Sequence, residues 1–276
     1  MTRSILITGC SSGIGRDAAV TLKVRGWRVF AGLRRAEDAR ALEAEHGLET
    51  VLIDLADPRS IETGFDDVLL RSGGTLDALF NNAAYAIPGA IEDMPVDALR
   101  AIFETNFFGW HDLTRRAIPV MRRQGHGRIV MNSSVLGMVA APWRGAYNAS
   151  KFALEGLTDT LRVEMRDTPV HVVTIAPGPI RTPFRRNSVP HFERWIDWRA
   201  SPRAAQYESA LLPRLYAPPR RNRFELMPAA VTRHLLHALE APHPRPRYHV
   251  TVPTHAMGAL RRILPVRALD AILSRG

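Results

Sequence analysis

The chain has 276 residues, of which 46% are hydrophobic and 23% are charged, a composition typical of a globular domain that argues against a disordered protein. Its single cysteine, Cys10, excludes an internal disulfide bond. The chain contains no run of about 18 apolar residues, so a membrane-spanning helix is not predicted. Because residues 1–8 lack the apolar run and cleavage site of a secretion signal, we expect a cytoplasmic protein.

The formal net charge is +10, from 37 basic and 27 acidic residues. Two of the basic residues are lysines, Lys23 and Lys151, and the other 35 are arginines. A bias this strong indicates a codon preference of the whole genome, so the charge alone is weak evidence for a nucleic-acid-binding protein. The bias makes each lysine informative, because a guanidinium does not replace a compact ammonium at every site.

Short apolar, β-rich runs alternate with helical patterns along the chain. The runs occupy residues 4–8, 27–33, 50–54, 76–81, 128–133, 171–176 and 248–252. Helical patterns occupy, among others, residues 16–25, 61–71, 96–123 and 149–166. Strands that are apolar along their length and alternate with helices predict a buried parallel sheet covered on both faces. We therefore expect an α/β protein, organised as one domain over residues 1–276.

A glycine-rich turn follows the first predicted strand and opens a helix. Glycines let a backbone approach a pyrophosphate, and the helix start supplies N–H groups and positive potential. The spacing, Gly-x₃-Gly-x-Gly, differs from the commoner Gly-x-Gly-x-x-Gly, and a tight turn without a ligand is the alternative. The candidate cofactor-binding residues of this turn are Gly9, Ser11, Ser12, Gly13, Ile14 and Gly15.

The end of the second predicted strand carries arginines where NAD-binding folds carry an acidic residue for the ribose hydroxyls. Arg34 and Arg35 stand there, and the first carboxylate is Glu37. A guanidinium binds a 2′-phosphate through paired hydrogen bonds, which predicts NADP(H) as the cofactor, against the alternative of a surface arginine. Asp54, at the end of the third predicted strand, either meets the adenine edge or caps a turn.

Three side chains with complementary chemistry are expected to converge. Tyr147 and Lys151 lie four residues apart in a predicted helix and therefore on one face of it. Ser134 comes at the end of a predicted strand, where open α/β sheets bind ligands. A tyrosine and a lysine at this spacing also occur by chance, but the glycine turn upstream favours a catalytic site.

Their chemistry suits the interconversion of a carbonyl and an alcohol, which needs a proton donor in one direction and a base in the other. A phenol has a pKa near 10. A cation about 4 Å away supplies roughly the 4 kcal/mol needed to lower that pKa by about three units. We expect Lys151 to have this effect on Tyr147 and to hold ribose hydroxyls, and Ser134 to bind the substrate oxygen.

Together these motifs resemble the short-chain dehydrogenase/reductase family, in its single-domain branch, closely over residues 3–185. The resemblance implies a seven-stranded, doubly wound Rossmann-type sheet with catalytic Ser134, Tyr147 and Lys151. It implies that Asn106 supports a proton relay. Further cofactor-binding residues implied by the family motifs are Asn82, Ala83, Pro177, Gly178, Ile180 and Thr182.

The resemblance also bears on substrate and assembly. Residues 150–157 are similar to members that act on steroids, retinoids and other hydrophobic alcohols or ketones, which implies a hydrophobic small-molecule substrate. Family members pair through the helices around 96–121 and 151–166, which implies a homodimer or homotetramer. Ala84 replaces the glycine usual in the family's Asn-Asn-Ala-Gly motif. A non-enzymatic NADP(H)-binding regulator on the same fold is the alternative, disfavoured because the tyrosine and the lysine are both present.

Two segments extend this pattern. Residues 183–228 contain seven prolines and many arginines directly after the predicted cofactor loop, so we favour a substrate lid over a solvated excursion. Residues 253–276 form an amphipathic tail, which we expect to pack on the lid or a neighbouring subunit rather than on a membrane surface.

His234 and His237 have no third partner in sequence, so no metal site is predicted. The expected pocket borders are Tyr85, Trp143, Arg144, Phe184, Trp195 and Trp198.

Overall fold

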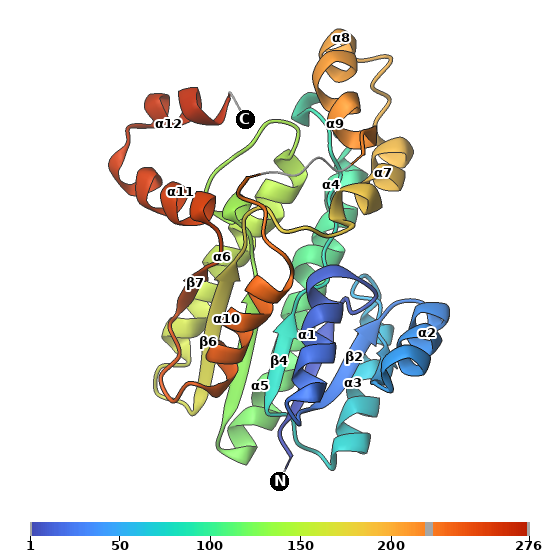
Figure 1. The fold of residues 1–276 in the computed structure, drawn as a ribbon, viewed down its shortest axis with the longest axis vertical. Coiled ribbons are helices and arrows are strands. Elements are labelled where there is room, and N and C mark those ends of the chain that lie inside the picture. The colour runs from blue at the N-terminus through green and yellow to red at the C-terminus, as the bar shows by residue number, and fades with distance from the viewer. Residues whose placement is uncertain (1, 219–222, 275–276) are drawn as a thin grey trace.

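The computed structural model describes residues 2–218 and 223–274. Within them, seven parallel strands form one sheet in the order β3-β2-β1-β4-β5-β6-β7 (Figure 1). The order reverses between β1 and β4, where open α/β sheets bind ligands beyond the carboxyl ends of their strands. The predicted doubly wound sheet is confirmed. The strands are β1 (Ser4–Thr8), β2 (Arg28–Leu33), β3 (Glu49–Leu52), β4 (Ala78–Asn81), β5 (Gly127–Asn132), β6 (Val170–Ala176) and β7 (Arg247–His249).

Helices cover both faces because successive strand side chains point to opposite sides. Ile5 and Ile7 of β1 pack in one core with α1 (Gly13–Val24), α2 (Ala36–His46) and α10 (Ala229–Glu240). Leu6 packs in the other core, against α3 (Pro58–Ser72) and the long helices that follow β4 and β5. The strands are therefore buried on both sides, as their continuous apolar runs predict.

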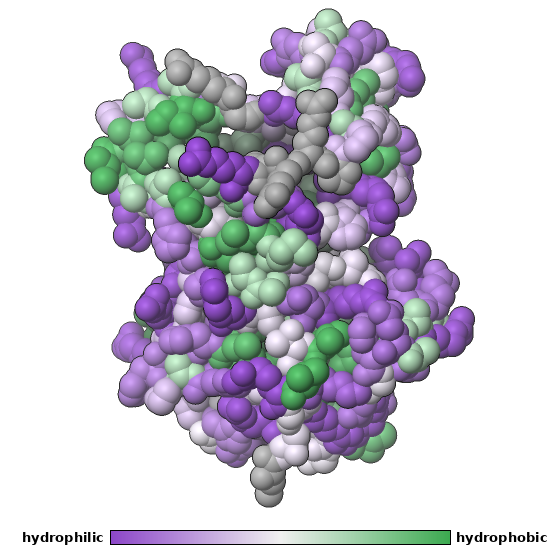
Figure 2. Space-filling model, viewed as in Figure 1, coloured by the Kyte–Doolittle hydropathy of each residue, from purple (hydrophilic) through white to green (hydrophobic). Residues whose placement is uncertain are grey.

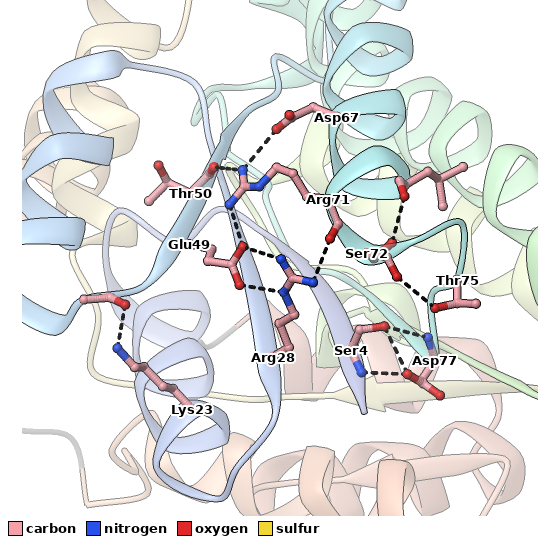
Figure 3. A network of polar contacts seen from close by, with 12 residues as sticks. Ser4, Lys23, Arg28, Glu49, Thr50, Asp67, Arg71, Ser72, Thr75 and Asp77 are labelled. Atoms are coloured by element: carbon pink, nitrogen blue, oxygen red, sulfur yellow. Dashed lines mark hydrogen bonds and ion pairs between the residues drawn. The ribbon is translucent and has the colours of Figure 1, made fainter. Parts of the chain in front are cut away.

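The amino ends of β2 and β3 are tied together by a polar network (Figure 3). Arg28 donates to both carboxylate oxygens of Glu49 at 2.7 and 3.0 Å, and Arg71 of α3 reaches the same carboxylate at 2.8 Å. The hydrogen bond from Arg28 is the main cause that holds the pKa of Glu49 below its usual range. Lys23 donates to the carbonyl oxygens of His46 and Gly47, so this lysine stabilises the end of α2.

The predicted helix over 96–123 is continuous but irregular. It comprises α4 (Val96–Phe103), a π-helical segment (Glu104–Phe108) and α5 (Gly109–Gln124). Asn106 is the central residue of the π-helical segment and is fully buried. Segments of this kind inside α-helices are frequent at functional sites.

The insertion at 183–228 is largely helical. It contains α7 (Phe184–Trp195), α8 (Ala204–Gln206), a π-helical segment (Tyr207–Leu211) and α9 (Leu212–Tyr216), and residues 219–222 lie outside the described residues. Tyr207 is fully buried, donates to Asp93 at 2.7 Å and accepts from the N–H of Ala90 at 2.8 Å. The insertion therefore packs on the body of the fold above α4 (Figure 1).

The tail forms α11 (Val252–Ile263) and α12 (Val266–Leu273). Residues 275 and 276, which belong to the tail predicted over 253–276, lie outside the described residues. No residue of α12 is buried, and Figure 1 places the two helices on the opposite side of the molecule from α7–α9. The tail therefore does not pack on the lid, one of the two partners that we expected from the sequence, and its packing on a neighbouring subunit stays a prediction. Figure 2 shows hydrophobic side chains gathered over these helices. Ile263 at the end of α11 and Val266 at the start of α12 are both exposed. Among the described helices, none has the length and apolar character needed to span a bilayer.

Candidate active site

The turn after β1 is held close to the end of β4. Gly9 and Gly13 have φ angles of 75° and 57°, in the left-handed region that favours glycine. A Cβ atom on Gly9 would lie 2.8 Å from Cα of Ala83. One on Gly15 would lie 2.7 Å from Nδ2 of Asn82 and would overlap the carbonyl oxygen of Gly9. Side chains at these positions would therefore push the turn away from the end of β4, so the glycines keep these two segments in close contact.

The amino-terminal end of α1 is open to a ligand. Its N-cap residue, Ser12, makes no side-chain hydrogen bond to the helix, and the first turn of α1 holds no acidic residue. Ser11 is exposed beside it, whereas Ile14 packs against the core. The N–H groups of such a helix start carry positive partial charge and attract anions. The turn and the helix end together fit the pyrophosphate of a dinucleotide.

The end of β4 supports the turn from below. The hydroxyl of Thr8 accepts from the backbone N–H of Asn82 at 2.9 Å and from that of Ala83 at 3.0 Å. The side-chain amide of Asn82 donates to the carbonyl oxygen of Thr8 at 2.8 Å and accepts through Oδ1 from Nδ2 of Asn132. The structure thus brings Asn82 and Ala83 to the glycine turn, as the family motif implies.

The loop after β6 closes the same site. The carbonyl oxygen of Pro177 accepts from Val135 N–H at 2.7 Å, next to Ser134. A Cβ on Gly13 would lie 2.9 Å from Cγ2 of Thr182, so this loop also touches the glycine turn. Ile180 forms a bridge to Leu226 at the far end of the insertion. Gly178 packs against Thr251, at the start of α11.

At the end of β2 the two arginines differ in their partners. Arg35 pairs with Asp38 at 2.9 Å and with Glu37 at 3.4 Å. Arg34 is exposed, and it makes no ion pair or hydrogen bond with the described residues. Asp54 accepts from the backbone N–H of Ala56 at 3.0 Å, so it caps a turn, as one of its two interpretations predicted. Of these two arginines, Arg34 is therefore the one without an acidic partner in the described part of the chain.

Asn106 connects the loop after β4 to the helix that carries Tyr147 and Lys151. Its Oδ1 accepts from the N–H of Tyr85 at 3.1 Å, and its Nδ2 donates to the carbonyl oxygen of Tyr85 at 2.9 Å. Nδ2 also lies 3.3 Å from the hydroxyl of Ser150 on α6 (Gly145–Glu164). The side chain therefore acts on Tyr85 and Ser150 in this structure and makes no hydrogen bond to Lys151.

Ser134, Tyr147 and Lys151 come together at the carboxyl end of β5. Ser134 caps a short 3₁₀ helix by accepting from Leu136 N–H at 3.1 Å. Tyr147 and Lys151 lie on one face of α6, and Nζ of Lys151 is 5.7 Å from the ring centre of Tyr147. Nζ donates to the carbonyl oxygen of Asn132 at 2.9 Å. A hydroxyl, a phenol and an amine thus meet beside the glycine turn.

Burial dominates the ionisation of this group. It raises the pKa of Tyr147 to about 12, against the opposing effects of a hydrogen bond with Ser134 and of the Arg144 charge. It lowers the pKa of Lys151 to about 7, against the attraction of Glu155. The expected lowering of the Tyr147 pKa by Lys151 is therefore not what the structure gives. The phenol keeps its proton around neutral pH, which suits a proton donor.

The depressed pKa of Lys151 predicts a pH-dependent cost of burial. Between about pH 7 and pH 10.5 the unfolded chain holds a proton on Lys151 that the folded chain has lost, so stability rises with pH there. Below that window the folded protein bears the full cost of a buried ammonium. Lys151→Met should therefore stabilise the cofactor-free protein most at pH 6 and progressively less towards pH 9, as measured by urea unfolding. A stability difference that stays constant over this range would contradict the assignment.

Two residues of the site escaped prediction from the sequence. Trp110 lies on α5 with Nζ of Lys151 4.2 Å from its ring centre, and its indole N–H donates to the carbonyl oxygen of Ala83 at 2.8 Å. Asn132 accepts from Lys151 and orients Asn82. Trp110 follows Asn106 by four residues, which places both on one face of the predicted helix. This spacing was the signal in the sequence that could have identified Trp110 as a residue of the site.

Comparison with known proteins identifies the class to which this fold and site belong. The family model for short chain dehydrogenases matches residues 3–192, so the chain belongs to that family and is one of its oxidoreductases. An uncharacterised oxidoreductase of Escherichia coli, YbbO, is 40% identical over 273 residues, which are 99% of this chain and 94% of YbbO. The human 17-beta-hydroxysteroid dehydrogenase type 1 is 33% identical over 270 residues, which cover 90% of this chain and 77% of the length of the human protein.

Solved structures show the same fold. A short chain dehydrogenase/reductase from Burkholderia phymatum, in complex with NAD, has a TM-score of 0.77 and 23% identity over 99% of this chain and 95% of its own. A short chain dehydrogenase from Burkholderia cenocepacia, in complex with NADP, has a TM-score of 0.75 and 23% identity over 99% and 97%. The family therefore includes proteins that bind either nucleotide.

Proposed function

We propose that this chain is an NADP(H)-dependent oxidoreductase that interconverts a carbonyl and a primary or secondary alcohol. The observation that carries the proposal is the meeting of Ser134, Tyr147 and Lys151 beside a glycine cradle at the carboxyl ends of the central strands. When bound, the reduced cofactor supplies a hydride to the carbonyl carbon. Incubation with NADPH and a panel of aldehydes and ketones should give alcohols and NADP⁺ in equal amounts.

Each side chain has one task in this proposal. Tyr147 gives its hydroxyl proton to the carbonyl oxygen during reduction and takes it back during oxidation. Ser134 donates a hydrogen bond to the same oxygen. Lys151 holds the ribose hydroxyls through hydrogen bonds from its compact amino group. Asn106 positions the loop at Tyr85 through the two hydrogen bonds described above.

Aromatic side chains from the insertion favour a hydrophobic substrate. The ring of Phe184, at the start of α7, meets that of Tyr147 edge-on at 5.4 Å between centres. The same apolar cluster contains five of the six expected pocket borders, Tyr85, Trp143, Phe184, Trp195 and Trp198. An insertion that packs its rings around the candidate acid supports the lid interpretation over a solvated excursion.

Arg34 supports NADP(H) over NAD(H) because its guanidinium, which has no ion-pair partner among residues 2–218 and 223–274, lies where the 2′-phosphate is expected. Arg34→Leu should raise the dissociation constant for NADPH by about 10- to 100-fold, the value of a charged hydrogen bond, and leave that for NADH nearly unchanged. Arg35→Leu is the matched control, since Arg35 is already paired with Asp38. Tighter binding of NADH than NADPH by the unaltered protein would refute the cofactor assignment.

Assembly and location complete the proposal. Val96, Phe108, Phe152 and Val163 expose large fractions of apolar side chains on the helices through which family members pair. These residues favour a homodimer or homotetramer. The exposed apolar side of α11 and α12 is open to a neighbouring subunit as well, with a membrane surface as the alternative. We expect the enzyme to work on small molecules in the cytoplasm, without nucleic acid.

A further inference from the structure

The amine of Lys151 lies over the face of an indole ring. Its Nζ is 4.2 Å from the ring centre of Trp110, on α5, whereas the ring centre of Tyr147 is 5.7 Å away. Trp110 is fully buried, and Lys151 is 1% exposed. The negative face of an aromatic ring attracts a cation most strongly where water is excluded. The contact therefore favours the protonated form of an amine whose burial favours the neutral form.

Other charges near Lys151 are few. Among the described residues, Glu155, one turn further along α6, is the group whose charge acts on the amine. Arg247 of β7 lies with Nη2 2.5 Å from Oε2 of this carboxylate and offsets part of its attraction. From β5 comes the uncharged carbonyl oxygen of Asn132, and the phenol of Tyr147 is neutral at pH 7 because burial raises its pKa to about 12. With the carboxylate partly neutralised, a charge on Lys151 depends on the contact with the indole.

The N–H of the same indole reaches the glycine turn. It donates to the carbonyl oxygen of Ala83 at 2.8 Å. The backbone N–H of Ala83 donates in turn to the hydroxyl of Thr8 at 3.0 Å, and Cα of Ala83 lies 2.8 Å from the place of a Cβ on Gly9. The side chain of Trp110 therefore joins the amine of Lys151 to the backbone at the glycine turn.

The contact between Lys151 and Trp110 differs from the other contacts between cations and rings in the described chain, which use arginines. Arg3, for example, lies over the ring of Trp27 at 4.3 Å, and half of the Arg3 side chain is exposed. A hydrated guanidinium gains less from a ring than a desolvated amine does. Trp27, buried at the amino end of β2, is therefore a suitable control for Trp110.

We propose that Trp110 is a positioning residue, whose ring holds the Lys151 amine as a cation beside the glycine turn and whose N–H fixes that turn. An ammonium has three N–H donors. One is used by the carbonyl oxygen of Asn132, so two remain for the ribose hydroxyls. The task of Lys151 rests on the proposed function, whereas the effect of the ring on the amine is a property of the protein without cofactor.

The presence of two lysines allows a direct test of the ring. Protein labelled with ¹³C at the ε carbon of lysine contains two labelled sites, Lys23 and Lys151, and the variant Lys23→Arg assigns their signals. Lys23 is exposed and donates to backbone carbonyl oxygens, so it is an internal control. A pH titration of the cofactor-free protein, followed by nuclear magnetic resonance, reports the protonation of Lys151 without any turnover.

Fluorinated tryptophan weakens the ring without removing it, because fluorine draws electron density from the ring face. Expression with monofluoro- and then difluorotryptophan replaces all five tryptophans, and of these Trp110 is the one that contacts Lys151 in the described structure. The titration midpoint of Lys151 should fall with each fluorine, and that of Lys23 should stay constant. This comparison keeps the side-chain shape, so it decides the question even where a substitution of Trp110 prevents folding.

Substitutions separate the ring from its N–H. Trp110→Leu should lower the Lys151 midpoint by about one pH unit, whereas Trp110→Phe, which keeps an aromatic face, should retain most of the original value. Both variants lose the hydrogen bond to Ala83, so both should raise the dissociation constant for NADPH by about 2- to 10-fold. Trp27→Leu should change neither quantity. Circular dichroism establishes that each variant is folded.

The outcomes distinguish this inference from the proposed function. A Lys151 midpoint that is insensitive to fluorination, or equally lowered in Trp110→Leu and Trp110→Phe, overturns the role of the ring. An unchanged dissociation constant for NADPH in Trp110→Phe overturns the role of the N–H. Neither result removes the oxidoreductase, which is tested by carbonyl reduction in the unaltered protein. If that reduction fails, the titration of Lys151 still decides whether the ring supports the cation.

Discussion

Replacing Tyr147 by phenylalanine is expected to lower kcat for carbonyl reduction by about 10²- to 10⁴-fold, the usual contribution of a positioned proton donor. The ring itself is retained, so its edge-on contact with Phe184 and the burial of α6 should survive. The dissociation constant for NADPH and the melting temperature should change little. Stopped-flow measurement of NADPH oxidation gives the rate, and fluorescence titration gives the affinity.

Tyr248→Phe provides the matched control, because its hydroxyl bonds to His237 of α10 and accepts from the N–H of Arg245 at 3.0 Å, outside the lid and the candidate site. Its kcat should stay within a factor of about two, since the hydroxyl that it removes contacts neither Ser134 nor Lys151. If Tyr147→Phe and Tyr248→Phe had equal rates, Tyr147 would not be the acid. A non-enzymatic regulator would then be the better interpretation of the same fold.

Gly15→Ala is expected to abolish most of the affinity for the nucleotide, because the new methyl group would overlap the carbonyl oxygen of Gly9 and crowd Asn82. The turn must then open, and the backbone N–H groups at the start of α1 lose their alignment. Saturating NADPH at 100 times its dissociation constant stabilises a protein by about 2.7 kcal/mol. The variant should lose most of that stabilisation in a thermal unfolding experiment.

Gly156→Ala is the control in the exposed middle of α6, where an added Cβ meets nothing within 4 Å. It should raise the free energy of unfolding by roughly 0.5–1 kcal/mol and leave NADPH binding unaltered. Far-ultraviolet circular dichroism establishes that both variants are folded before ligand is added. An NADPH affinity of Gly15→Ala within a few-fold of the unaltered protein would show that the glycine cradle does not hold the nucleotide.

The sequence predicts the sheet well because each strand is apolar on both faces, and a parallel sheet requires this. The ends of strands are less well predicted: the last one covers Arg247–His249 rather than residues 248–252. The chain turns there into α11, whose start packs against Gly178. That contact joins parts of the chain far apart in sequence, so no local pattern reveals it.

The π-helical segment around Asn106 also depends on contacts between parts of the chain that are far apart in sequence. A regular helical pattern runs through residues 96–123, and local propensity gives no sign of an irregular turn. The hydrogen bonds of Asn106 to Tyr85 and Ser150 join three elements, and they exist only in the folded chain. The residue could be singled out from its family motif, but its contacts could not.

The pKa values of Tyr147 and Lys151 are the property of the site that the sequence predicts least well. Spacing along a helix correctly places Tyr147 and Lys151 on one face, yet it does not tell how deeply they are buried. Burial raises the pKa of the phenol and lowers that of the amine. The Lys151 amine also turns to the carbonyl oxygen of Asn132 and to Trp110. Electrostatic arguments from sequence need the solvent exposure that only the fold supplies.

A crystal structure of the protein with NADP⁺ tests the central claim most directly. We predict density for the nicotinamide facing the hydroxyl of Tyr147, for the adjoining ribose at Lys151, and for the 2′-phosphate at Arg34. Nucleotide bound elsewhere, or a nicotinamide separated from Tyr147 by more than the width of a small carbonyl compound, would contradict the account.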